Sequence, residues 1–197
     1  MRSGTGNDRI AGEAGHDRIG GDAGDDTLSG GPGNDTLAGG SPDAASAGND
    51  VFAGGKGDDL LQGGAENDIY LFGAGDGIDT LTDEGGTDRI VFGEDVAPGD
   101  VRVLQGADGL ELRVAGGTRI VVPEGTAIET VGFADGTEWS WAELLRRSML
   151  PGAGDDAIAL GDRVRIGGEE LRITGCGPHV QVPRRFVILA TRTEQDA

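Results

Sequence analysis

The sequence predicts an all-β fold, a parallel β-roll, from the repetition, composition and spacing of one short unit. Residues 3–38 repeat a nine-residue unit four times without a gap, as SGTGNDRIA, GEAGHDRIG, GDAGDDTLS and GGPGNDTLA. Each unit has the pattern Gly-Gly-x-Gly-x-Asp-x-apolar-x, so a glycine-rich turn alternates with a stretch long enough for one short strand. A strict period of this kind is typical of a solenoid, and two units would complete one flattened coil.

The repeats place their aspartates in a regular stack. Aspartates two units apart are separated by eighteen residues, as Asp8 is from Asp26 and Asp17 is from Asp35. In the predicted roll such pairs lie one above the other at about 4.8 Å, the spacing of neighbouring strands. Two carboxylates about 5 Å apart repel by roughly 3 kcal/mol at an effective dielectric constant of about 20. Several such pairs would cancel the stability of a small domain, about 5–15 kcal/mol, unless cations lie between them.

Calcium is the cation that fits this pattern, because it takes six to eight oxygen ligands and tolerates irregular geometry, whereas magnesium demands a tight octahedron. We therefore predict that the fold is calcium-stabilised and binds several Ca²⁺ ions. The expected side-chain ligands are Asp8, Asp17, Asp26, Asp35, Asp50, Asp59, Asp68, Asp79 and Asp88. The expected backbone carbonyl ligands lie near Gly4, Gly6, Gly15, Gly24, Gly31, Gly33, Gly40, Gly48, Gly55, Gly57, Gly64 and Gly77.

The period continues after one interruption. Residues 41–47 replace a single spacer, and this six-residue excess is expected to bulge out at a loop, where insertions cost little. The units resume at Asp50, and the eleven-residue step from Asp68 to Asp79 implies one slightly longer connection. Glu66 stands where the pattern has its fourth-position glycine, so we expect it to weaken one site.

Composition restricts the classes of function. The formal charge is −19, and residues 1–100 hold 21 acidic and only 5 basic side chains. This acidity argues against nucleic-acid binding, which needs the opposite sign. The sequence also contains no transmembrane run. The alternative of a flexible acidic linker is disfavoured, because a linker has no reason to keep an apolar residue two positions after every aspartate.

No catalytic constellation is evident in the sequence. The only histidines are His16, in the variable slot of a repeat and expected to be a solvated loop residue, and His179. Neither an HExxH nor a Gly-x-Ser-x-Gly motif is present. Cys176 is the single cysteine, which excludes an internal disulfide. We expect this chain not to be an enzyme, although a catalytic domain could precede residue 1 in a longer protein.

Three regions are predicted: the roll at 1–91, a β-rich cap at 92–149 and a small antiparallel β tail at 150–197. A cap is expected because an open solenoid end exposes apolar surface and unpaired strand edges. Ser140 and Glu143 form a capping box, which predicts a short helix from Trp141 to Ser148. The strands expected in the cap are 101–104, 110–114, 119–122 and 128–133.

The nonapeptides resemble the calcium-binding repeat of the RTX family. The stretch YLFGAGDGIDTLTDEGGTDRIVFGEDV, followed by IETVGFADGTEW, is similar to the haemolysin-type calcium-binding-related domain over roughly residues 67–145. Proteins of this family are typically exported by type I machinery, which reads an uncleaved carboxy-terminal signal. Because the chain has no amino-terminal signal peptide, the resemblance implies secretion by this route to the calcium-rich exterior. The implied partners are calcium ions and the type I secretion machinery.

Several interpretations stay open at the sequence level. The leading hypothesis is a calcium-binding β-roll module of a secreted RTX-type bacterial exoprotein, which folds on calcium binding after export. The alternatives are a spacer, adhesion or phage-tail-like protein, or the non-catalytic tail of a secreted enzyme or toxin. The tail is similar to the small β-barrels of phage head–tail joining proteins, and its position equally suits an export signal. Its expected strands are 163–166, 170–174, 179–182 and 186–192.

Overall fold

The structure is a computed structural model, and its chain divides into two compact units, Met1–Ser148 and Met149–Ala197. In the second unit, β16 (Arg163–Ile166) and β17 (Glu169–Arg172) pair as an antiparallel hairpin, which corresponds to the first two strands expected in the tail. The residues that the structure describes are 1–40, 48–106, 108–126, 128–148, 163–166 and 169–172.

Some sequence predictions fall outside these described residues. They concern the bulge at 41–47, the strands at 179–182 and 186–192, and the side chains of Cys176 and His179. These expectations stay predictions.

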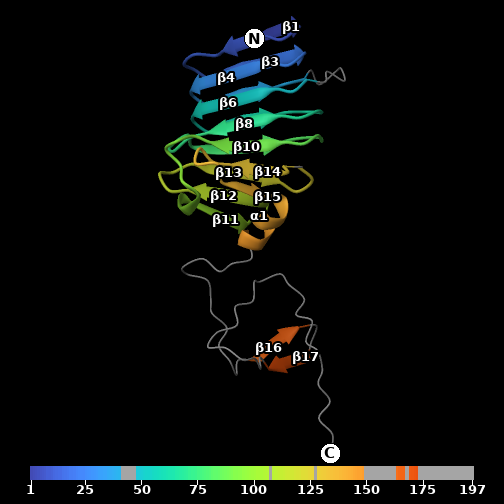
Figure 1. Cartoon of the computed structure of the whole chain (residues 1–197), viewed down its shortest axis with the longest axis vertical. Helices are drawn as coiled ribbons and strands as arrows, with labels where there is room; N and C mark the ends of the chain where they lie inside the picture. Colours follow the sequence, from blue (N-terminus) through green and yellow to red (C-terminus); the bar gives the residue numbers. More distant parts are fainter. Residues whose placement is uncertain (41–47, 107, 127, 149–162, 167–168, 173–197) are drawn as a thin grey trace, which may run out of the picture. The chain divides into compact units, whose positions relative to one another are not determined.

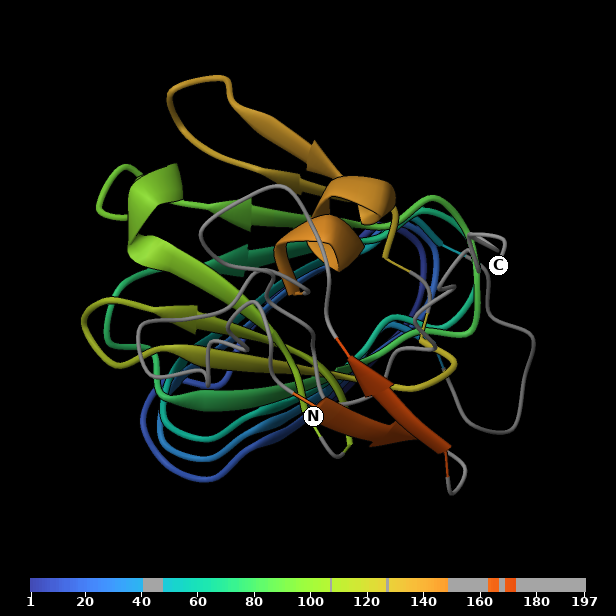
Figure 2. The same ribbon diagram turned by 90° about the horizontal axis from the view of Figure 1, so that it is seen from below.

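The first unit is a parallel β-roll, which confirms the predicted fold class. Two sheets stack their strands in alternation, so that the chain passes from one sheet to the other through each turn (Figure 1). Figure 2 looks along the stack, and there the successive turns from β1 to β10 lie over one another. The parallel strands of one sheet are β1 (Arg2–Thr5), β3 (Arg18–Ala23), β5 (Thr36–Ala38), β7 (Leu60–Gln62) and β9 (Ile78–Thr82). Those of the other are β2 (Arg9–Ala11), β4 (Thr27–Pro32), β6 (Val51–Lys56), β8 (Ile69–Phe72) and β10 (Arg89–Phe92).

The register of the strands follows the repeat. Ile10 lies opposite Leu28, which is two units further along the chain. Leu28 in turn lies opposite Phe52, twenty-four residues on, because the six-residue excess falls between them. The roll therefore absorbs the insertion without losing the alignment of its coils.

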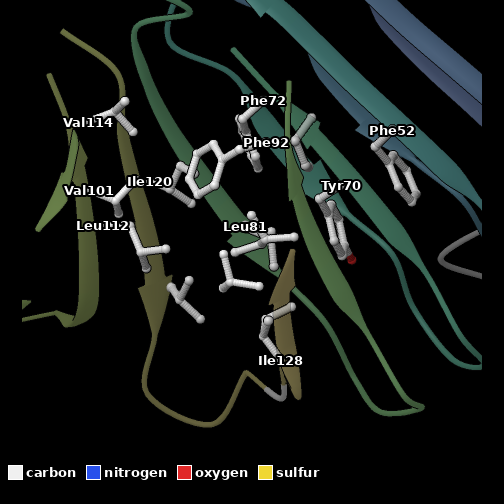
Figure 3. Packing of buried hydrophobic residues seen from close by; sticks show 14 of the residues in the cluster. Phe52, Tyr70, Phe72, Leu81, Phe92, Val101, Leu112, Val114, Ile120 and Ile128 are labelled. Atoms are coloured by element: carbon white, nitrogen blue, oxygen red, sulfur yellow. The ribbon is translucent and has the colours of Figure 1, made fainter. Parts of the chain in front are cut away.

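The core is a ladder of apolar side chains between the two sheets. The apolar position of each unit points inward, and Leu28, Phe52 and Leu61 are fully buried. Phe52 and Tyr70 stack with their ring centroids 5.1 Å apart, as Figure 3 shows. Each inward side chain thus contacts its counterparts in neighbouring coils as well as the facing sheet, which explains why one apolar residue per unit suffices.

Residues after β10 close the far end of the roll. The 3₁₀ turn η1 (Pro98–Asp100) leads into an antiparallel meander, whose last strand pairs parallel to β9. The other sheet is extended by a parallel strand on β10 and then an antiparallel one. These strands are β11 (Val101–Gln105), β12 (Gly109–Val114), β13 (Arg119–Pro123), β14 (Thr130–Gly132) and β15 (Glu138–Ser140). All four strands expected here are present, whereas β15 was not anticipated.

The helix α1 (Trp141–Ser148) packs against β11 and β15 (Figure 1). Its amino terminus is capped as expected, because the Ser140 hydroxyl accepts the Glu143 backbone N–H at 3.4 Å. Leu144 is buried beneath the helix. The Glu143 carboxylate binds Arg146 and Arg147 instead of reaching back to complete a capping box.

Candidate metal centre

The repeat aspartates lie in two columns, one along each edge of the roll. In seven of the nine, all except the first aspartate of each column, the Oδ1 atom accepts the backbone N–H of the aspartate one coil earlier, at 2.7 to 3.0 Å. We call these sets the first and the second column. The first column contains Asp8, Asp26, Asp50, Asp68 and Asp88. The second column contains Asp17, Asp35, Asp59 and Asp79.

The second carboxylate oxygen has no such partner in most of these residues. It is buried, and an unpaired buried carboxylate oxygen is costly unless a cation or a hydrogen-bond donor reaches it. Hydrogen bonding to the neighbouring coil therefore leaves one ligand atom of each residue free for a metal. The residues whose Oδ2 atom is buried and without a hydrogen bond are Asp17, Asp26, Asp35, Asp59, Asp68, Asp79 and Asp88.

Backbone oxygens converge on the same places. The position that a Cβ on Gly21 would occupy lies 2.2 Å from Asp26 Oδ2 and 2.9 Å from the Gly39 carbonyl oxygen. The equivalent position at Gly30 lies 2.2 Å from Asp35 Oδ2 and 2.6 Å from the carbonyl oxygen of Gly54. Only a first-position glycine leaves this space open. Carboxylate and carbonyl oxygens therefore gather beside each such glycine, and calcium accepts both kinds of donor.

The carbonyls expected from the sequence behave differently from these. At the fourth position of the repeat they point along the stack, so that the Gly15 oxygen faces Gly33 and the Gly33 oxygen faces Gly57. The carbonyls of Gly64 and Gly77 accept backbone hydrogen bonds from the next coil. Carbonyl oxygens of first-position glycines, which the sequence-based set did not include, lie with these carboxylates around the would-be Cβ of a first-position glycine one coil earlier. Those glycines are Gly30, Gly39, Gly54 and Gly63.

Burial shifts the acidity of these carboxyl groups. Loss of hydration raises the pKa of Asp68, Asp79 and Asp88 to about 7 and that of Asp50 to about 6, and neighbouring carboxylates raise these values further. Burial likewise raises the pKa of Asp59. Without a cation, these five aspartates therefore hold protons above the ordinary pKa of 3.8.

These shifts predict how the calcium-free protein responds to pH. A carboxyl group with a raised pKa binds protons more strongly in the folded than in the unfolded chain, so stability is lost as the pH rises from about 4 to about 7. We expect the calcium-free chain to be most folded in mild acid and to unfold towards neutral pH. Calcium affinity should rise over the same interval, because the ligands must be deprotonated. Circular dichroism in the presence of a chelator across this pH range measures the effect, and a gain of structure with rising pH would contradict it.

The side chains at the variable position before each repeat aspartate form a second row of hydrogen bonds between coils, which was not predicted from the sequence. The Asn7 side chain accepts the Asp25 N–H at 3.1 Å, and Asp25 accepts the Asn49 N–H at 2.8 Å. His16, expected to be only solvated, is exposed but its Nδ1 atom also accepts the Asn34 N–H at 2.8 Å. These bonds run to the following coil, whereas the aspartate bonds run to the preceding one. The signal was available as the recurrence of Asn and Asp at this slot.

The first column does not end at the last repeat. Glu129, which precedes β14, lies at the register position above Asp88, and its Oε2 atom accepts the Asp88 N–H at 2.6 Å. The glutamate thus makes the bond that an aspartate makes elsewhere in the column. The second column ends differently, because Ile120 pairs with Asp79 and supplies no carboxylate.

Two parallel sheets joined by glycine-rich turns, with inward aspartates stacked along both edges, define a calcium-binding β-roll. Comparison with known families agrees: residues 2–37, 45–78 and 74–95 match the RTX calcium-binding nonapeptide repeat, in four copies. Over these matched residues the chain carries calcium-binding repeats of the RTX type. No curated protein matches the chain. Within the part of the chain that the structure describes, no helix is long and apolar enough to cross a membrane.

Proposed function

We propose that this chain is the calcium-binding β-roll module of a secreted RTX-type bacterial exoprotein, which folds when it meets calcium after type I export. The observation that carries the proposal is the set of buried, unpaired Oδ2 atoms along both columns. We assign the nine column aspartates as side-chain ligands, with first-position glycine carbonyls beside them. The matching repeats make calcium the ion, and the β-roll is a structural element without a catalytic role of its own.

The electrostatics of the columns support folding outside the cell. Asp59 accepts the Asp35 N–H, so their backbones lie one coil apart and their charges are close. Ionised neighbours at about 5 Å repel by roughly 3 kcal/mol per pair. Where calcium is scarce, during synthesis, this repulsion would therefore keep the chain unfolded. Where calcium is abundant, after export, the bound ions would let it fold.

Calcium titration tests the binding function. Isothermal titration of the calcium-depleted chain, with circular dichroism before and after, should show several ions bound and a gain of β-structure. Extracellular calcium modules bind at about 10⁻⁴–10⁻³ M, and we expect the repeat sites in this range. Magnesium at the same concentration serves as the control and should not restore the fold. Absence of binding at millimolar calcium would overturn the proposal.

Export is tested separately with the full chain and with a version that ends at Ser148. In cells that carry a type I exporter, the full chain should reach the medium, and the shortened version should be retained although its roll still binds calcium. Equal export of the two would remove residues 150–197 from the secretion signal without affecting the calcium-binding function.

A further inference from the structure

The last repeat departs from the others at its first position. In most units before it, this position is a glycine whose missing side chain leaves room for the aspartate of the same unit, as at Gly21 and Gly63, and the exceptions are the small residues Ser3 and Ala74. In the unit that contains Asp88, the residue five positions earlier is Asp83. A third carboxylate is therefore placed inside the roll, where the repeat pattern provides only space.

Asp83 meets two aspartates of the first column. One carboxylate oxygen each from Asp68, Asp83 and Asp88 lies within 4.8 Å of the others, and all three residues are buried. Asp68 and Asp88 are 0% exposed, and their Oδ2 atoms are buried without a hydrogen bond. Three carboxylates this close, two of them with an unpaired oxygen, require a cation or protons to coexist.

The oxygens converge on one point beside Gly63. The position that a Cβ on Gly63 would occupy lies 2.3 Å from Asp68 Oδ2, 2.4 Å from Asp83 Oδ2 and 2.1 Å from the hydroxyl oxygen of Tyr70. These oxygens therefore lie close together beside Gly63, and carboxylate oxygens are ligands that calcium prefers.

Tyr70 holds Asp83 in place. Its hydroxyl donates a hydrogen bond to Asp83 Oδ2 at 2.5 Å, and the Gly85 N–H donates to Asp83 Oδ1 at 2.9 Å. The Tyr70 ring is fully buried against Phe52, which fixes the direction of the hydroxyl (Figure 3). Burial raises the pKa of Tyr70, so the hydroxyl stays a donor. The carboxylate is therefore oriented by side chains that belong to the core.

We propose that Asp83 adds a third carboxylate to Asp68 and Asp88 in the last calcium site of the first column, with Glu129 as the residue that positions Asp88. Glu129 comes from the capping segment and binds the Asp88 N–H, so an ion here would join the last coil to the cap. The proposal deepens the calcium-binding function proposed above and rests on it for the identity of the ion. Three carboxylates around one ion exceed the stacked pair of an ordinary repeat, so this site should bind calcium more tightly.

The test compares the full chain with its Asp83→Gly and Asp83→Asn variants. Asp83→Gly restores the glycine of the other repeats, and Asp83→Asn keeps an oxygen to accept the Tyr70 hydroxyl while removing the charge. Calcium titration should show the tightest phase weakened at least tenfold in both variants, because each leaves only the stacked pair of an ordinary repeat. The remaining ions should bind as before, and circular dichroism in calcium should confirm that each variant folds.

Terbium, a luminescent calcium substitute, reports on the site directly. Tyr70 is the only tyrosine of the chain and its hydroxyl contacts Asp83, so tyrosine-sensitised terbium emission should be strong at this site. It should fall in Asp83→Asn and stay unchanged in Asp108→Asn, whose side chain is exposed between β11 and β12. If the wild-type chain binds calcium but neither the affinity of the tightest phase nor the emission changes in the Asp83 variants, this inference is wrong and the repeat function stands. If the wild-type chain binds no calcium, the proposed function itself fails.

Discussion

Replacing Asp59 with alanine is expected to weaken calcium binding by about ten- to a hundredfold, because the change removes two interactions at once. The Oδ2 atom is a free buried oxygen in the second column, and the Oδ1 atom accepts the Asp35 N–H at 2.7 Å. Alanine would leave that N–H buried without a partner and one ion without a charged ligand. The loss of a charged partner of this kind costs about 1–3 kcal/mol. Calcium titration of the variant measures it.

Asp108→Ala is the matched control for this substitution. It removes the same charge from an exposed residue between β11 and β12, outside the columns. Calcium affinity should be unchanged in this variant. Equal weakening by both substitutions would mean that calcium responds to the total charge of an acidic chain, and the stacked columns would not be its sites.

Gly33→Ala is expected to destabilise the roll by about 3 kcal/mol or more, through a clash that the structure cannot relieve cheaply. Gly33 has φ +137°, and a Cβ there would lie 1.6 Å from the carbonyl oxygen of Gly15 in the coil before it. That oxygen is backbone, so relief requires the two coils to separate. Separation would also break the nearby bond between the Asp17 N–H and Asp35. Chemical denaturation in saturating calcium measures the loss.

Gly6→Ala is the control that distinguishes the cost of the steric clash from the cost of the positive φ angle. Gly6 also occupies the fourth position of its unit and has φ +113°, but nothing lies within 4 Å of its would-be Cβ. Only the conformational penalty applies, so we expect a loss of about 1–2 kcal/mol. Similar losses in both variants would show that close stacking of the coils contributes little.

The periodicity of the sequence predicts most of the fold and both columns of aspartates. A single rule, two units between stacked aspartates, correctly pairs Asp8 with Asp26, because identical units must adopt identical turns. Counted in units, the rule also holds across the insertion, after which Asp50 stacks on Asp26 although twenty-four residues separate them. The roll is predictable because every contact recurs, so one unit determines the environment of the next.

The repeat period could not predict contacts that occur only once in the structure. Glu129 follows Asp88 by forty-one residues and enters the column only because the cap folds back to add β14 beside β10. Asp83 looks like an imperfect glycine position until Tyr70 is seen to orient it. Both depend on packing between residues far apart in the sequence, which the pattern of a nine-residue repeat does not predict.

The row of hydrogen bonds at the variable position was missed for a different reason. A repeat pattern marks as variable any position whose residue type changes, and Asn7, His16 and Asp25 differ in type. They share one property, a side-chain acceptor that reaches the next coil. Reading this position by hydrogen-bonding capacity instead of by identity would have found it.

The alternation of the columns determines how such a protein can change in length. Consecutive units face opposite edges, so Asp8 and Asp17 begin different columns, and only the first column receives the carboxylate of Glu129. Duplicating eighteen residues would add one complete coil and return every later unit to its own edge. Duplicating nine would move each later aspartate to the opposite edge and bring the wrong column beneath the cap. The array can therefore grow or shrink only by even numbers of units, and gene duplications that survive should be found in multiples of two.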